Sequence, residues 1–190
     1  MSMPMPDLTK PWTRDAVLAL PDDGNRYELL DGELLVSPSP RPIHQLAVCA
    51  LYDRIRPYVG EYRLGLTCPA PADLDFRAGQ LLQPDLFVIQ REPGQSLLEW
   101  SGFGIPIWIA EVLSPSTAFS DRNRKRKYYL KAGVGEYWIV DCDARLIERW
   151  RPGDERPEIL TERIEWQPAP APEALVIDLA EYFREIWGDA

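Results

Sequence analysis

The sequence has few of the side chains that bind zinc. It holds one histidine, His44, and three cysteines among 190 residues. A structural zinc site needs paired Cys and His ligands at short spacings, so this composition excludes one. Any Ser-His-Asp mechanism would have to use His44. Cys49, Cys68 and Cys142 lie far apart in apolar or strand-like sequence, which predicts buried free thiols.

Long apolar runs are also missing. No stretch approaches the roughly 20 apolar residues of a membrane-spanning helix. The first seven residues lack the basic and apolar regions of a signal peptide. We therefore expect a cytoplasmic protein with no membrane partner.

Positive charge is scarce, because 21 Lys and Arg face 30 Asp and Glu and give a net charge of −9. A surface of that sign repels phosphate backbones at long range and excludes generic coating of nucleic acid. Residues 121–131 differ, with six basic side chains and one acid. The length and the 45% of hydrophobic residues fit one folded domain. We expect a core over about residues 12–150 and a C-terminal extension, residues 151–190, packed on it.

The order of the expected elements indicates an α/β or α+β fold, with a mixed central sheet flanked by helices and an N-terminal β-hairpin. Asp31-Gly32 between two strand-like runs is the hairpin signal. The second helix is expected to end near Pro57 and to bury Leu46. Periodicity and turn residues predict helices at 13–20, 43–59, 121–132 and 179–187, and strands at 26–30, 33–36, 62–68, 72–76, 85–90, 105–113, 136–141, 145–150 and 175–177.

Three acids stand at positions that packing alone does not explain. Glu111 lies near the end of a strand that is apolar on both faces, Asp85 begins an apolar strand, and Glu28 precedes the Asp-Gly turn. A buried, unpaired carboxylate is costly, so each acid is either paired or functional. Each alone is more often a strand-end cap or an ion-pair partner. Together they would form a hard-oxygen site suited to Mg²⁺ or Mn²⁺.

The basic helix offers a cation for such a site. On a helical wheel Lys125 shares the apolar face with Tyr128 and Tyr129, whereas Arg122 and Arg126 point away. An inward ammonium group would orient water or stabilise charge on a phosphate. The alternative is a solvated basic helix whose aliphatic stems cover the sheet.

Several short blocks in one order resemble the Uma2 family, also called DUF820. They are Trp12-Thr13, Arg26–Glu33, Ser37–Pro40 with His44-Gln45, Pro84-Asp85, Glu111–Thr117, Asp121, Lys125, Tyr129 and Gly133–Asp141, and the match spans roughly residues 12–150. The resemblance implies the restriction-endonuclease-like fold of the PD-(D/E)XK nuclease superfamily. It also implies Mg²⁺-dependent endonuclease activity, with DNA as the substrate.

The same resemblance assigns roles to residues. Asp85 and Glu111 correspond to the metal-binding acids, and Glu28 resembles an extra acid from an N-terminal element. The position two residues after Glu111 holds Leu113 instead of the usual lysine. Lys125 is the natural substitute and Lys127 the second choice. His44, at a helix start, and Tyr27 are further accessory candidates.

Two other functions remain open from the sequence. The fold could persist as a non-catalytic nucleic-acid-binding or protein-interaction module, which predicts that Arg or Lys pairs off the acids. The chain could also form a structural homodimer through exposed Trp and Tyr, of which there are 15.

Overall fold

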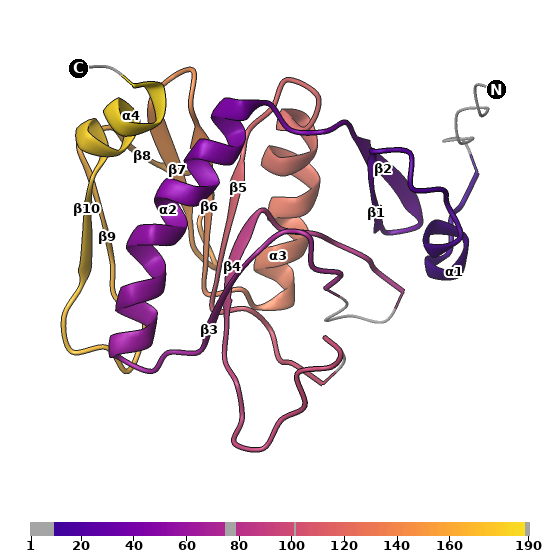
Figure 1. The fold of residues 1–190 in the computed structure, drawn as a ribbon, viewed down its shortest axis with the longest axis horizontal. Coiled ribbons are helices and arrows are strands. Elements are labelled where there is room, and N and C mark those ends of the chain that lie inside the picture. The colour runs from indigo at the N-terminus through magenta and orange to yellow at the C-terminus, as the bar shows by residue number, and fades with distance from the viewer. Residues whose placement is uncertain (1–9, 75–78, 101, 189–190) are drawn as a thin grey trace.

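The computed structural model describes residues 10–74, 79–100 and 102–188, and its centre is a six-stranded mixed sheet (Figure 1). The strand order is β3-β4-β5-β6-β7-β8, in which only the β5–β6 pair is parallel within the described residues. The strands are β3 Leu66–Pro69, β4 Leu86–Ile89, β5 Trp108–Val112, β6 Glu136–Asp141, β7 Leu146–Trp150 and β8 Glu158–Leu160. The predicted fold class is therefore confirmed.

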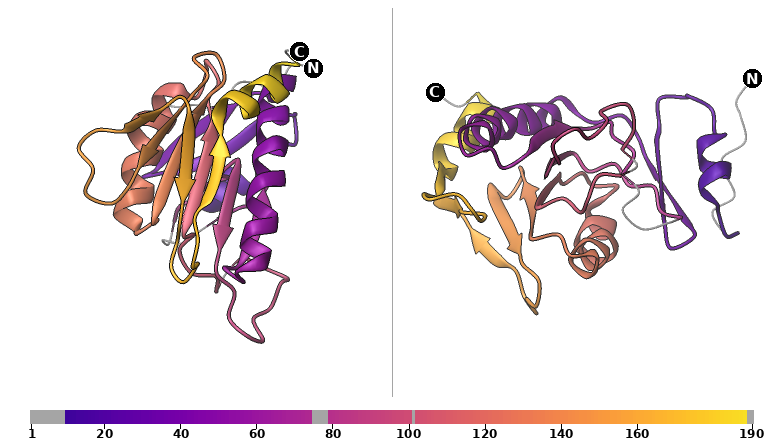
Figure 2. Two further views of the ribbon diagram at one scale, coloured as in Figure 1. Left: turned by 90° about the vertical axis from the view of Figure 1, so that its left-hand side faces the viewer. Right: turned by 90° about the horizontal axis from the view of Figure 1, so that it is seen from below.

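Helices cover both faces of this sheet. The helices α2 (Pro42–Glu61) and α4 (Leu179–Trp187) lie on one face, and α3 (Arg126–Ala132) lies on the other (Figure 2). Successive side chains of a strand point to opposite faces, so β4 serves both layers. Leu86 and Val88 join the apolar cluster under α2, whereas Phe87 and Ile89 join the cluster under α3.

The N-terminal hairpin forms beside the sheet as predicted. Its strands β1 (Arg26–Leu30) and β2 (Glu33–Ser37) pair antiparallel, and α1 (Arg14–Leu18) precedes them. Asp31 and Gly32 have φ angles of 52° and 81°, which a two-residue hairpin turn requires. Leu29 and Leu81 exchange two backbone hydrogen bonds of 2.7 and 3.0 Å. These bonds fix the hairpin against the segment that leads into β4.

The C-terminal segment contains two strands that the sequence analysis missed. These are β8 and β9 (Arg163–Trp166), and the latter pairs with β10 (Leu175–Asp178). The acid- and proline-rich composition of this segment hid the alternation of β9, and β8 has none. Trp166 and Tyr182 are buried in the same cluster as Trp108 and Trp138. The terminal helix α4 has the predicted bounds.

Two expectations about α2 are wrong. The helix continues through Pro57 to Glu61, because burial of Tyr58 and Val59 offsets the backbone bond that proline cannot make. Leu46 is 52% exposed, since it lies beside the buried stripe and not within it.

The cysteines also differ in part from the prediction. All three are free, and Cys142 is buried, but Cys68 is half-buried. Cys49 is exposed, because it lies on a side of α2 that borders a cavity.

Several strand bounds were predicted too wide. β3 begins at Leu66 and β5 at Trp108, both later than expected. In the predicted strand 72–76, Leu74 makes an isolated bridge to Leu82, and the end of that range lies outside the described residues. Residues 121–132 split into a π-helical segment η1 (Ser120–Lys125) and α3, which Gly133 ends with a φ of 103°.

The proposed association surface of Trp and Tyr is wrong. Among the described residues of these two types, only Trp187 is exposed, at 41%. The others are buried or half-buried, since most fill the two apolar clusters. A homodimer therefore stays a prediction without this surface.

Within the described ranges, no helix is long and apolar enough to cross a bilayer.

Candidate active site

The central pair of acids is positioned by the β4–β5 ladder. The antiparallel register pairs Leu86 with Ala110, and continuing it by one residue sets Asp85 opposite Glu111. Residues opposite each other project to the same face, with Cβ atoms about 5 Å apart. This is the α3 face, because Phe87 and Ile109 on the same side of the strands pack under α3. The two carboxylates therefore share one end of the sheet.

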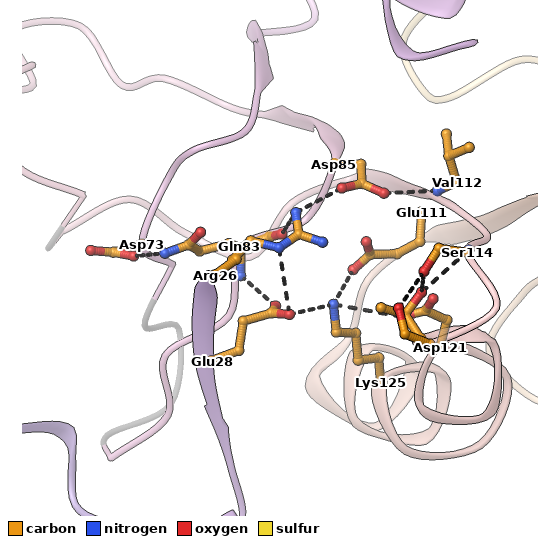
Figure 3. A network of polar contacts seen from close by, with 12 residues as sticks. Arg26, Glu28, Asp73, Gln83, Asp85, Glu111, Val112, Ser114, Asp121 and Lys125 are labelled. Carbon is orange, nitrogen blue, oxygen red and sulfur yellow. Dashed lines mark hydrogen bonds and ion pairs between the residues drawn. The ribbon is translucent and has the colours of Figure 1, made fainter. Parts of the chain in front are cut away.

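Asp85 is held from three directions, of which Figure 3 shows the contacts with Arg26 and Val112. Arg26 Nη1 donates to Oδ1 at 2.8 Å, and the backbone N–H of Val112 donates to Oδ2 at 2.9 Å. His44 Nε2 lies 3.0 Å from Oδ2 and must carry the proton, since a carboxylate only accepts. Burial alone would raise the pKa of Asp85, but the His44 hydrogen bond and the Arg26 charge hold that pKa well below its usual value. Asp85 is thus a fixed carboxylate.

Lys125 lies at the centre of the remaining acids. Its Nζ is 2.9 Å from Glu28 Oε2, 3.1 Å from Glu111 Oε1 and 3.6 Å from Asp121 Oδ1. Burial would lower the pKa of Lys125, but these carboxylates outweigh burial and raise it. The ammonium group therefore stays charged although the residue is only 1% exposed. The π-helical turn η1 supplies both Asp121 and Lys125.

The charged groups around Asp85 and Lys125 form an acid cluster, which contains more negative than positive groups. Its four buried carboxylates are Glu28, Asp85, Glu111 and Asp121. Against them stand two permanent cations, Arg26 and Lys125. Burial, with the neighbouring acids, raises the pKa of Glu111 well above its usual value, although Lys125 opposes this. Burial also raises the pKa of Asp121 to about 6.

These acids fit a hard divalent cation by their chemistry. Among the described residues, the buried Oδ1 of Asp121 has no hydrogen-bond partner, which is a sign of unused negative charge. No three His, Cys, Asp or Glu side chains converge on one point within residues 10–74, 79–100 and 102–188. Mg²⁺ commonly takes one or two protein carboxylates and completes its shell with water and phosphate oxygens. Asp85 and Glu111 suit that role.

Two cavities border the cluster. One of about 890 Å³ lies between the N-terminal segment and the start of α2, and Arg26, His44 and Asp85 line it. The other, of about 210 Å³, is lined by Glu28 and Lys125 among others. Small molecules or parts of larger ligands can therefore approach Asp85 from the larger cavity and Glu28 from the smaller one.

The structure brings together most of the residues singled out from the sequence. The cluster contains Glu28, Asp85, Glu111 and Lys125, with His44 at its margin.

Two accessory candidates lie outside the cluster. Lys127 is exposed, because it follows Lys125 by two positions and so projects from another side of the helix. Tyr27 lines the larger cavity, but its hydroxyl donates to Asp23 at 2.8 Å.

Sequence reasoning gave three members of the cluster no role in the site, although the family resemblance contains them. Arg26 stands two residues before Glu28 in one strand, so the period of two could have placed both on one face. Asp121 precedes Lys125 by four residues, which is a helical ion-pair spacing. Tyr129 also follows Lys125 by four residues, and its hydroxyl donates to Glu111 Oε1 at 3.1 Å.

Comparison with known proteins places the chain in a family. A solved structure of "a putative nuclease belonging to DUF820 from Anabaena variabilis ATCC 29413" superposes with a TM-score of 0.72 at 24% sequence identity. The alignment covers 93% of this chain and 99% of that one, and it shows a shared fold. A comparison with curated proteins found no match. The sequence model of the Uma2 family, described as "Putative restriction endonuclease", matches residues 14–186 and supports a nuclease function. The chain therefore belongs to the Uma2 family.

Proposed function

We propose that the protein is a Mg²⁺-dependent endonuclease that hydrolyses phosphodiester bonds in DNA. The observation that carries this proposal is the buried surplus of carboxylates around Lys125, with Asp85 and Glu111 opposite each other on β4 and β5. The description of the family as restriction endonucleases supports the substrate class. Mn²⁺, another oxygen-preferring divalent cation, is expected to substitute.

Asp85 and Glu111 are the proposed metal ligands. When bound there, Mg²⁺ would polarise a phosphate oxygen and lower the pKa of a water molecule. Arg26 and His44 keep Asp85 ionised and fix its orientation. Tyr129 donates to Glu111 and fixes that carboxylate in the same way.

Lys125 and Glu28 complete the proposed machinery. The ammonium group of Lys125 lies where it can stabilise negative charge that develops on the scissile phosphate. Glu28 Oε2 accepts from this ammonium group, and Glu28 Oε1 accepts the backbone N–H of Gln83 at 2.8 Å. Glu28 thus holds the lysine against the segment that leads into Asp85. Lys125 replaces the ammonium group that Leu113 cannot supply.

Cleavage of closed circular DNA tests this proposal. Single-stranded and duplex circles would be incubated separately with Mg²⁺ or with EDTA, and linear products would be measured on gels. We expect Mg²⁺-dependent cleavage of at least one form, and a loss of at least about 100-fold in Asp85→Asn, Glu111→Gln and Lys125→Met.

The matched control for these variants is Glu136→Gln. Glu136 is also a buried carboxylate, but it lies at the start of β6 and pairs with Arg151 at 3.2 Å. We expect this variant to retain full activity. Absence of cleavage by the wild-type protein, or equal cleavage by all variants, would overturn the proposal.

A second candidate is a non-catalytic module that retains the nuclease fold. It is favoured by the pairing of Asp85 with Arg26 and of Glu28 and Glu111 with Lys125. Calorimetric titration with Mn²⁺ separates the two candidates. Saturable binding that Asp85→Asn loses and Glu136→Gln retains supports the enzyme. No saturable binding to the wild-type protein supports the module.

A further inference from the structure

The two cavities beside the acid cluster share one wall. Ser37, Ser116 and Thr117 line both of them. The larger cavity borders Asp85, and the smaller one borders Lys125. The cavities therefore adjoin at this wall, and we call the two together the track, which borders Asp85, Glu28 and Lys125 but not Glu111.

The burial of the charged groups limits which ligands can reach them through this track. Glu28, Asp85, Glu111 and Lys125 are each only 1–2% exposed. Duplex DNA is a stiff body with a persistence length of about 50 nm, and its phosphates lie on its outer edge. A cavity of about 890 Å³ has the volume of a small-molecule pocket, which holds a few nucleotides but no section of duplex. A phosphate that reaches these acids must belong to a flexible strand.

The charge of the track also favours an unpaired strand over a duplex. Affinity for duplex DNA comes mainly from cations that neutralise phosphates. Four cationic side chains line the track, and three of them, Arg26, Arg124 and Lys125, are already paired with carboxylates, which leaves the exposed Arg41 to meet a phosphate. The whole chain carries a net charge of −9. An unpaired strand can instead gain affinity by stacking its bases on aromatic rings.

Aromatic rings stand along both parts of the track. Phe119 lines the smaller cavity and is 69% exposed, so its ring is free to contact a ligand there. The guanidinium of Arg124 lies 5.9 Å from the centre of its ring, so the ring is held from one side. Tyr27 lines the larger cavity. A strand that passes the acids would meet an aromatic ring in each cavity.

We propose that the substrate is single-stranded DNA, which runs through both cavities and stacks a base on Phe119. The inference rests on the proposed nuclease function for its chemistry, and it adds the form of DNA that is bound. Phe119 is then a binding residue that discriminates unpaired from paired strands.

Binding of labelled oligonucleotides tests this inference. Fluorescence anisotropy would compare a 20-nucleotide single strand (about two helical turns when paired) with the same strand annealed to its complement, for the full chain. Ca²⁺ would replace Mg²⁺, and gels would verify that the DNA stays uncut. We expect the single strand to bind at least about tenfold more tightly than the duplex, and Phe119→Leu to remove about tenfold of that affinity.

Trp187→Leu is the matched control. Trp187 is an exposed aromatic residue with an arginine, Arg145, 5.8 Å from the centre of its ring, but it lies on α4. We expect this variant to bind like the wild type, and thermal melting would verify that both variants fold. Duplex binding as tight as single-strand binding, no binding of either form, or unchanged binding by Phe119→Leu would overturn the inference. Cleavage of duplex circles without single-strand preference would leave the nuclease proposal intact, whereas single-strand binding without cleavage would leave only the binding inference.

Discussion

The two faces of the central sheet are built from the same strands but bury different kinds of side chain. Under α2 and α4, Trp108, Trp138 and Trp166 pack edge to face or tilted, with ring centres 5.0 to 5.6 Å apart. Under α3, the strands carry Glu111 toward Lys125. Burial of a large apolar side chain stabilises a fold by about 1.5–3 kcal/mol. Burial of charges costs free energy that their pairing recovers only in part.

This difference indicates that the two faces contribute differently to stability and to activity. Both faces bury an apolar cluster that stabilises the fold, so stability does not depend on the α3 face alone. The α3 face can therefore hold a carboxylate surplus that is unfavourable for folding but useful for binding a cation. Changes in the apolar cluster under α2 should then alter stability alone, and changes in the acid cluster should alter activity, sometimes with a gain in stability.

The largest expected effect is loss of the aromatic packing on the α2 face. Trp138→Ala removes a fully buried ring and leaves a cavity, so the free energy of unfolding should fall by about 3–5 kcal/mol. Urea denaturation measures this change. Activity per folded molecule should stay at the wild-type level. A stable Trp138→Ala variant without activity would contradict the division between the faces.

The second prediction is a gain in stability on the α3 face. The pKa of Asp121 is higher in the folded chain, at about 6, than its ordinary value of 3.8. Its protonated form therefore stabilises the fold below pH 3.8, and this stabilisation is lost as the pH rises through 6. At pH 8, Asp121→Asn should raise the free energy of unfolding by on the order of 3 kcal/mol. Urea denaturation between about pH 4 and pH 8, on both sides of the shifted pKa, measures the difference in unfolding free energy between the variant and the wild type. A variant that is less stable than the wild type at pH 8 would count against a carboxylate surplus.

The third prediction compares two buried tyrosine hydroxyls. Tyr182 donates to Ala47 O at 2.9 Å on the α2 face, and Tyr129 donates to Glu111 on the α3 face. Tyr182→Phe should lower the free energy of unfolding by about 1 kcal/mol and leave cleavage unchanged. Tyr129→Phe should lower the cleavage rate by about tenfold, because Glu111 loses a fixed orientation. Equal effects of the two variants on cleavage would remove the contrast.

Local signals explain what the sequence predicted well. The Asp31-Gly32 turn specifies its hairpin by backbone conformation alone. Helical spacing was enough to predict that Lys125 faces the sheet, because Lys125 shares a helix face with the apolar ring of Tyr129. The predicted bounds of α4 agree with its caps, since the side chain of Asp178 accepts from the N–H of Glu181 and Gly188 has a φ of 66°.

Long-range pairing explains most of what the sequence did not predict. Arg26 meets Asp85 across 59 positions, a contact that no local pattern encodes. The strand β8 is short and mostly exposed, so it shows no apolar alternation. Cys49 resembles a core residue by its neighbours, and only the position of α2 beside the large cavity leaves it exposed.

The most direct test of the proposed metal site is the melting temperature of the protein with and without Mg²⁺. A cation that binds the folded chain alone raises its stability, by about 2.7 kcal/mol at a concentration 100 times the Kd. We predict a rise in the melting temperature of the wild-type protein and of Glu136→Gln, and no rise in Asp85→Asn. An equal rise in all three proteins, or no rise in any, would contradict a metal site at Asp85 and Glu111.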